Sequence, residues 1–274
     1  MKKHQIITVV LILALMFGII IYITIQSQQE GDSAITTGAQ SVTEQAIIAA
    51  PQPTDTIQVD PTEGVYTFLQ GPKSWKEKRP WSGIWGKTFM DGGSFGGFGC
   101  GLCCMANIYS TLTEYKCSPV DMYKYAQKNT GYWSGAIEWS FMKDGMESLG
   151  FASELRKKPD SYEEFQSIVA SSRACVMLVS SNEDDSYWQD TPGHYVTTFL
   201  YDAQTDKIFL GDSGNPDHNR QWVKLRKIYK ALKTASGYQF MTVTEYDTTK
   251  NKWKRNKITD KWVDPAELTY IAEE

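Results

Sequence analysis

Cysteine and histidine are scarce in this sequence of 274 residues, which contains five cysteines and three histidines. The cysteines are bunched between positions 100 and 175, without the spacing of a disulfide framework that staples a small secreted module. Disulfide stapling therefore does not explain them, and each can be weighed as a catalytic or structural group. They are Cys100, Cys103, Cys104, Cys117 and Cys175.

An excess of positive charge is also missing. The chain carries 28 Lys and Arg against 32 Asp and Glu, a formal net charge of −4. Proteins that bind nucleic acid through its phosphates normally present a basic surface, so we expect no nucleic-acid partner. The sequence also lacks a P-loop motif for nucleotide binding. Its length suits one well-buried domain with accessory segments.

Charged residues are absent from residues 6–25, which read IITVVLILALMFGIIIYITI. This run has the length of a helix that crosses the hydrocarbon core of a membrane. No small-residue cleavage site follows it, so we expect an uncleaved transmembrane anchor and not a signal peptide. Lys2 and Lys3 lie in the short segment 1–5 before it, which the positive-inside rule assigns to the cytoplasm. The remainder of the chain is then expected outside the cell.

Residues 26–62 contain no aromatic residue, lysine, arginine or cysteine. Such a segment cannot bury enough apolar surface to fold, and we interpret it as a disordered linker. As a flexible coil it would reach about 30–35 Å from the membrane. The folded domain is expected at residues 63–248, followed by a charged C-terminal tail at 249–274.

Helices are expected in the first half of the domain and strands in the second. Apolar residues recur at helical spacing in 101–113, and Ser118, Pro119 and Asp121 form the capping pattern of a second helix. Helices followed by strands, without regular alternation, predict an α+β domain with N-terminal helices packed on an antiparallel sheet. Further helices are expected at 136–149 and 162–171, and strands at 174–179, 194–201, 207–212 and 238–245.

Cys100 is the candidate nucleophile. It follows the glycine-rich stretch GGSFGGFG and stands at the start of the expected helix. Unpaired backbone N–H groups and the helix dipole favour a thiolate there and lower the pKa of the thiol. The flanking Gly99 and Gly101 are expected to leave room for the backbone of a substrate.

A thiolate of this kind needs a base, and His194 is the preferred candidate. It opens the expected strand 194–201 directly after the turn-forming sequence Thr191-Pro192-Gly193, whereas His218 lies in a polar loop. Without Cys100 in the chain, a histidine that begins a strand would be interpreted as a structural residue. With Cys100 present, we expect His194 to be catalytic.

Asp212 is the candidate group that orients His194 through its second ring nitrogen. If the hairpin loop is the five residues 202–206, Asp212 lies opposite Val196 and shares a face of the sheet with His194. A four-residue loop would put the two side chains on opposite faces unless a bulge intervened. The less favoured alternatives to Asp212 are Asn215 and Asp217.

A GCG sequence before a helix, a Gly-His step into a strand and a hairpin ending in Asp resemble cysteine-peptidase family thirty-nine. These are the double-glycine leader peptidases of the papain superfamily and their stand-alone relatives, and the resemblance covers about residues 81–245. It implies a papain-like fold with a triad of Cys100, His194 in PGHYV and Asp212 in FLGDSGNP. The family's GCGPTS reads GCGLCC here. The usual glutamine six residues before the nucleophile is replaced by Ser94, a candidate oxyanion donor.

A metal site is not expected, nor is a cofactor. Cys100, Cys103, Cys104 and Cys117 bring four sulfurs close together in the sequence. Adjacent helical residues, however, project about 100° apart, so these thiols cannot converge on one ion without distorting the helix.

Together these features predict a membrane-anchored, extracellular cysteine peptidase that hydrolyses amide bonds through a thioester intermediate. The expected substrate is a peptide or a cell-wall peptide, and the membrane is contacted through the N-terminal helix. Two alternatives stay open. One is a peptidoglycan endopeptidase or amidase, and the other is a non-catalytic binding module with the same fold.

Overall fold

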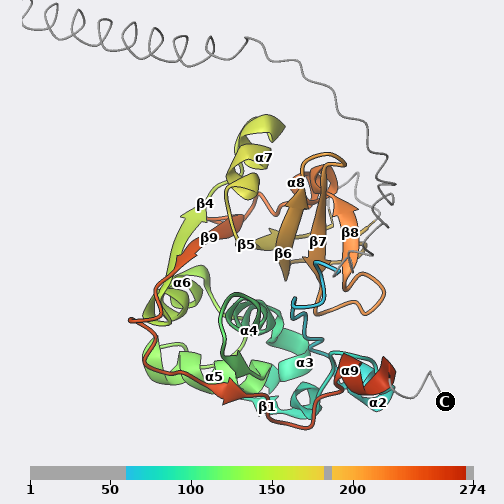
Figure 1. Cartoon of the computed structure of the whole chain (residues 1–274), viewed down its shortest axis with the longest axis vertical. Coiled ribbons are helices and arrows are strands. Elements are labelled where there is room, and N and C mark those ends of the chain that lie inside the picture. The colour runs from blue at the N-terminus through green and yellow to red at the C-terminus, as the bar shows by residue number, and fades with distance from the viewer. Residues whose placement is uncertain (1–59, 182–186, 270–274) are drawn as a thin grey trace, which may run out of the picture. The chain divides into compact units, whose positions relative to one another are not determined.

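The computed structural model describes residues 60–181 and 187–269, which belong to one compact unit of helices around a single large sheet (Figure 1). The sheet has six strands in the order β4-β9-β5-β6-β7-β8, and every adjacent pair is antiparallel. The mixed helix and sheet architecture with an antiparallel sheet is thereby confirmed. The strands are β4 (Phe151–Arg156), β5 (Ala174–Val179), β6 (His194–Asp202), β7 (Lys207–Gly211), β8 (Gln221–Lys224) and β9 (Phe240–Tyr246).

Most helices precede or interrupt the strands in sequence. The helices are α2 (Pro72–Lys76), η1 (Ile84–Lys87), α3 (Phe95–Phe98), α4 (Cys100–Leu112), α5 (Pro119–Asn129), α6 (Trp139–Ser148), α7 (Tyr162–Ala170), α8 (Leu225–Ala231) and α9 (Pro265–Thr269). Two small two-stranded pairs complete the fold, β1 (Phe89–Met90) with β2 (Gly93–Ser94) and β3 (Lys116–Cys117) with β10 (Asn256–Lys257).

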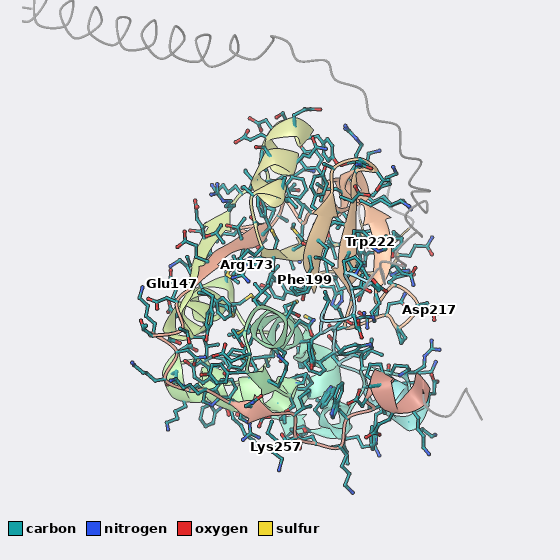
Figure 2. The ribbon with its side chains drawn as sticks, viewed as in Figure 1. Glu147, Arg173, Phe199, Asp217, Trp222 and Lys257 are labelled. Carbon is teal, nitrogen blue, oxygen red and sulfur yellow. The ribbon has the colours of Figure 1, made fainter. Side chains whose placement is uncertain are left out.

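Both faces of the sheet are buried at its centre, so every residue of β5 is buried. Val176 and Leu178 face the core that contains α4, whereas Met177 and Val179 face a second core formed with α7 and α8. Alternate residues of a strand point to opposite faces, which explains why this strand is apolar throughout. Phe199 of β6 belongs to the α4-side core (Figure 2).

Helix α4 is buried on all sides, because it lies between the sheet and helices α5 and α6. An amphipathic helix with one apolar face, as expected from its spacing of apolar residues, would leave the other face in water. Here every residue from Cys100 to Ser110 is buried, including Asn107. The Asn107 amide is satisfied, since its Oδ1 accepts from the backbone N–H of Phe68 at 2.8 Å. The nucleophile candidate therefore stands at the end of a central, rigid element.

The hairpin between β6 and β7 has a four-residue loop and a bulge. Asp202 pairs with Lys207, so the expected five-residue loop is wrong. The register shifts between Phe199 and Asp202, where Leu200 adopts a positive φ of 52°. Beyond the bulge Thr197 pairs with Gly211. The shorter loop alone would put Asp212 and His194 on opposite faces of the sheet. The bulge reverses that shift, so Asp212, which follows Gly211, lies on the face expected for it.

The chain beyond β9 packs against the helical half of the unit. Trp253 contacts Tyr109 and Tyr125, with ring centroids 5.2 and 4.6 Å apart. Trp262 joins an aromatic cluster with Trp81 and Phe68. The described part of the expected tail at 249–274 thus packs against the main core.

The capping pattern of the second helix is confirmed: the Ser118 hydroxyl accepts from the backbone N–H of Asp121, and the Asp121 carboxylate accepts from the N–H of Ser118. Expected helices and strands agree with α4 to α7, β5, β6, β7 and β9 within a few residues. Strands β4 and β8 and helix α8 were not expected. No described helix is long and apolar enough to span a membrane, and the expected anchor at 6–25 and linker at 26–62 lie largely outside the described residues.

Candidate active site

Cys100 is the first residue of α4 and is 8% exposed, at the edge of the core. The glycines beside it serve packing and not substrate access. A Cβ on Gly99 would lie 2.3 Å from the ring of Phe95, and one on Gly101 would lie 2.5 Å from Ile137. Both positions therefore need glycine because protein atoms already occupy the space, which corrects the expectation that they leave room for substrate.

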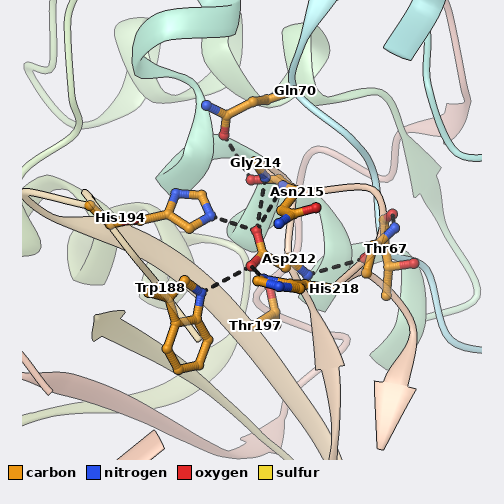
Figure 3. Close-up of polar contacts among 12 residues, drawn as sticks. Thr67, Gln70, Trp188, His194, Thr197, Asp212, Gly214, Asn215 and His218 are labelled. Atoms are coloured by element: carbon orange, nitrogen blue, oxygen red, sulfur yellow. Dashed lines mark hydrogen bonds and ion pairs between the residues drawn. The ribbon is translucent and has the colours of Figure 1, made fainter. Parts of the chain in front are cut away.

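His194 is the first residue of β6 and contacts both other candidates. Its Nε2 lies 2.8 Å from Oδ1 of Asp212 (Figure 3). The imidazole also lies beside the Cys100 thiol and lowers its pKa, and since Asp212 occupies Nε2, Nδ1 is the nitrogen left for the sulfur. The structure thus brings Cys100, His194 and Asp212 together in the order expected from the sequence, with the imidazole between sulfur and carboxylate.

Asp212 is fully buried at the end of β7 and is held by several donors. Its Oδ1 accepts from His194 and from the backbone N–H groups of Gly214 and Asn215, at 3.0 and 3.1 Å. Its Oδ2 accepts from the indole N–H of Trp188 at 3.0 Å. A buried carboxylate needs this degree of compensation to remain charged.

His218 also faces the carboxylate, which the sequence did not reveal. Its Nδ1 lies 3.6 Å from Oδ2 of Asp212, longer than a hydrogen bond, and its ring stacks on Tyr187 with centroids 3.9 Å apart. The sequence shows His218 in a polar loop, and no spacing rule brings that loop back onto β7. The sequence also did not reveal Trp188, which donates to Asp212 from the segment before β6.

The charges of the three groups reinforce one another. Burial alone would raise the pKa of the Cys100 thiol, but the hydrogen bond and charge of His194, with backbone hydrogen bonds from Tyr195 and Gly101, bring it below its ordinary value. Burial would lower the pKa of His194, yet Asp212 and Cys100 raise it to about 10. Hydrogen bonds from His194 and Trp188 and the proximity of His218 overcome burial and hold the pKa of Asp212 well below its usual range. The favoured state is a thiolate beside an imidazolium.

The two alternatives to Asp212 lie elsewhere. Asp217 is exposed and forms an ion pair with Arg79 at 2.7 Å. The Asn215 side-chain oxygen accepts from the backbone N–H of Asp217, while the backbone N–H of Asn215 donates to Asp212. Neither side chain stands in the place of Asp212 beside His194.

Ser94 ends strand β2 and precedes helix α3, and its side chain is exposed. Its hydroxyl makes no capping bond to α3 and lies near Gly97, where an added Cβ would be 3.7 Å from Oγ. Gly97 in turn lines a hollow of about 460 Å³ together with His194 and Asp212. Ser94 is therefore beside the candidate site, without a contact to Cys100 in the described part of the chain.

Gln70 connects the two sides of the site and was not singled out from the sequence. Its amide nitrogen donates to the carbonyl of Gly96 at 3.0 Å, in the glycine-rich approach to Cys100. Its amide oxygen accepts from the hydroxyl of Ser213 at 2.7 Å, directly after Asp212 (Figure 3). Because Gln70 is buried, both bonds are protected from water.

Substrate access is shaped by the loops that flank His194. The hollow beside the imidazole is lined largely by the segment from Tyr187 to Gly193 and by Gly214, Asn215 and His218. Gly214 permits the close approach of this loop, since a Cβ there would lie 3.0 Å from Cε1 of His194. Within the described ranges, no group of three or more His, Cys, Asp or Glu side chains is arranged to hold a metal ion.

Comparisons with known proteins give little similarity. No protein-family model matches the sequence, and no curated protein matches it. Among solved structures, the chain is similar to the peptidase domain of Streptococcus ComA, described as a bifunctional ABC transporter involved in a quorum-sensing pathway. The match has 12% identity and a TM-score of 0.37, and covers 53% of this chain and 90% of that domain. At this level the match supports no inference about activity.

Proposed function

We propose that this chain is a cysteine peptidase that hydrolyses peptide amide bonds through Cys100, His194 and Asp212. The observation that carries the proposal is the chain of contacts from the thiol to the imidazole and from Nε2 to Oδ1 at 2.8 Å. A nucleophile, a base and a group that orients the base are the parts that covalent acyl transfer requires.

The reaction begins with attack of the Cys100 thiolate on the carbonyl carbon of the scissile bond. The imidazolium of His194 then donates its proton to the leaving amine, and a thioester remains on the sulfur. Neutral His194 next removes a proton from water, which attacks the thioester and releases the carboxylic acid product. Asp212 stays ionised throughout and keeps the Nε2 proton of His194 in place.

The oxyanion of the tetrahedral intermediate needs donors near the sulfur. Backbone N–H groups at the start of α4 are available because a helix leaves its first N–H groups without intrahelical partners. The Ser94 hydroxyl is the second candidate donor, supported by its position over Gly97 at the rim of the hollow.

We further propose that residues 6–25 anchor the chain in a membrane and that the linker 26–62 holds the peptidase outside the cytoplasm. The support is the uncharged apolar run and the positive residues before it. The substrate is then a peptide or a cell-wall peptide within reach of the linker. Protease added to intact cells should cleave at 26–62 and release the domain, and complete protection would contradict this topology.

The activity is tested with the full chain and two substrates, casein and purified peptidoglycan. Cys100→Ala should abolish hydrolysis, while Cys175→Ala, which removes a buried thiol from the opposite side of β5, should leave it unchanged. Cleavage of peptidoglycan but not casein would identify a cell-wall endopeptidase or amidase. Hydrolysis that persists in Cys100→Ala would remove Cys100 from the mechanism.

A further inference from the structure

The first turn of α4 contains a second thiol one helical turn from the proposed nucleophile. Cys100 and Cys103 form a C-G-L-C sequence, and the N–H of Cys103 donates to the carbonyl of Gly99 at 2.8 Å, which closes the first turn. Residues three apart on a helix lie on the same side, with Cβ atoms about 5–6 Å apart. In disulfides the Cβ atoms are about 3.5–4.5 Å apart, so the first turn must tighten by about 1–2 Å for this pair to be linked.

The two thiols differ in their access to solvent. Cys100 is 8% exposed, whereas Cys103 is fully buried and interacts with Ser213, the residue after Asp212. An oxidant in solution therefore meets Cys100 first. Cys103 stands beneath it, close enough for the charges of the two sulfurs to interact.

Cys104 is the competing partner, but its environment is different. Its thiol hydrogen-bonds Thr197 on β6, within the sheet-facing core. Both residues lie on the side of the helix that carries Cys100, since residues three and four apart are neighbours. Of the two, Cys103 has the spacing known for redox-active pairs at helix starts.

We propose that Cys103 is a resolving cysteine that forms a reversible disulfide with Cys100 and thereby switches off the proposed nucleophile. The inference rests on the thiolate of Cys100, which the proposed function also uses, but not on hydrolysis of any substrate. All five cysteines are free in the structure, which therefore represents the reduced form.

The oxidant is a hydroperoxide. The Cys100 sulfur attacks its terminal oxygen, the O–O bond breaks, and a sulfenic acid forms with release of an alcohol, or of water from hydrogen peroxide. The sulfur of Cys103 then attacks the sulfur of Cys100 and forms the S–S bond. The hydroxyl group of the sulfenic acid leaves with the thiol proton of Cys103 as water. Two electrons pass from the two thiols to the peroxide, and a dithiol reductant returns them.

The consequence is protection from irreversible oxidation. A sulfenic acid without a neighbouring thiol proceeds to sulfinic and sulfonic acids, which a dithiol does not reduce. With Cys103 one turn away, the chain would instead stop at the disulfide and recover. The family pattern GCGPTS has no thiol at this position, so the device would be particular to the GCGLCC sequence of this chain.

The experiment treats the full chain with a small molar excess of hydrogen peroxide, alkylates the remaining thiols and digests with trypsin. Residues 88–116 form one peptide, bounded by Lys87 and Lys116, that contains Cys100, Cys103 and Cys104. In wild type this peptide should lose the mass of two hydrogen atoms and carry a single alkyl group. Labelling of Cys100 by a thiol probe should be lost after peroxide and restored fully by dithiothreitol.

Two variants decide which thiol resolves. In Cys103→Ala the mass loss should disappear, Cys100 should gain two or three oxygen atoms, and dithiothreitol should not restore labelling. Cys104→Ala is the matched control, one residue further along the same helix, and should behave as wild type. Full recovery of Cys103→Ala, or a disulfide that requires Cys104, would overturn the proposal. Because the readout is mass and labelling, failure of the chain to cleave any peptide would contradict the proposed function and leave this result intact.

Discussion

The two walls of the candidate site are built in different ways. The helical wall contributes one reacting atom, the Cys100 sulfur, at the start of a buried helix. The sheet wall contributes His194 and Asp212 from neighbouring strands, and the carboxylate accepts four hydrogen bonds, from His194, Trp188, Gly214 and Asn215.

Because of this difference, the two walls should contribute differently to activity and to stability. On the helical wall the thiol is small, and its removal leaves the packing of α4 in place. On the sheet wall the buried carboxylate joins β7, the loop after it and the segment before β6, so its removal leaves several donors unpaired. Substitutions on the helical wall should therefore affect activity alone, and those on the sheet wall both activity and stability.

The largest effect is expected for Cys100→Ser. A serine hydroxyl beside His194 is not ionised near neutral pH, so kcat/KM should fall on the order of 10³-fold or more. The melting temperature should change little, because size and packing are kept. Peptide hydrolysis and thermal unfolding by circular dichroism measure the two quantities, and a large loss of stability would contradict the proposed separation of the two walls.

Asp212→Ala should reduce both quantities. Loss of the carboxylate leaves the buried N–H groups of Trp188 and His194 without an acceptor, which should cost about 3–5 kcal/mol of unfolding free energy. Activity should fall on the order of 10²-fold or more, because His194 loses its orientation.

Asp212→Asn is the conservative comparison. Its amide oxygen can still accept from His194 and the loop N–H groups, so it should lose less stability than Asp212→Ala and keep part of the activity. Urea unfolding and kcat/KM of both variants test this. Equal losses in the two variants would show that Asp212 does not act by orienting His194.

A smaller effect is expected for Trp188→Phe, which removes the indole N–H donor to Oδ2 of Asp212. Hydrogen bonds to charged groups contribute about 1.5–3 kcal/mol, and a several-fold fall in kcat should accompany the loss. Trp85→Phe is the matched control, since its buried indole donates to the carbonyl of Leu69 and not to Asp212. Trp85→Phe should lower stability without a specific change in kcat, and equal kcat values in the two variants would refute the positioning role of Trp188.

The smallest expected effect is the dependence of the unfolding free energy on pH. The pKa of His194 is raised from 6.5 to about 10, so its stabilising contribution is fully present below pH 6.5 and is lost as pH rises through about 10. The pKa of Asp212 is lowered from 3.8, so its contribution is present above pH 3.8 and is lost as pH falls further. The difference in unfolding free energy between wild type and Asp212→Asn should therefore be largest between pH 3.8 and pH 6.5. A difference independent of pH would contradict the ionised state of the pair.

Thiol labelling provides a related check on the helical wall. The pKa of Cys100 is lowered, whereas burial raises that of Cys175 to about 12 and those of the other three thiols as well. Iodoacetamide below neutral pH should therefore modify Cys100 selectively. Equal modification of all five cysteines in the native chain would remove the special status of Cys100.

Local patterns in the sequence were sufficient to predict elements that depend on residues close together in the chain. The capping residues Ser118 and Asp121 predicted the start of α5, and the glycine-rich approach predicted a helix start at Cys100. The His194 and Asp212 pair was predicted on the correct face for an incorrect reason, because the loop has four residues and a bulge at Leu200 restores the register. A bulge depends on packing across the sheet, and no local pattern of residues in β6 predicts it.

By itself, the sequence determined which groups could perform the chemistry, since a chain with so few cysteines and histidines offers few combinations, and it determined the α+β class through the period of its apolar residues. The tertiary structure alone decided what surrounds those groups. Trp188, His218 and Gln70 reach the site from loops whose course the sequence did not reveal. Gly99 and Gly101 are required by Phe95 and Ile137. Such contacts arise from close packing between distant segments, and that packing is a property of the whole fold, which no short stretch of sequence contains.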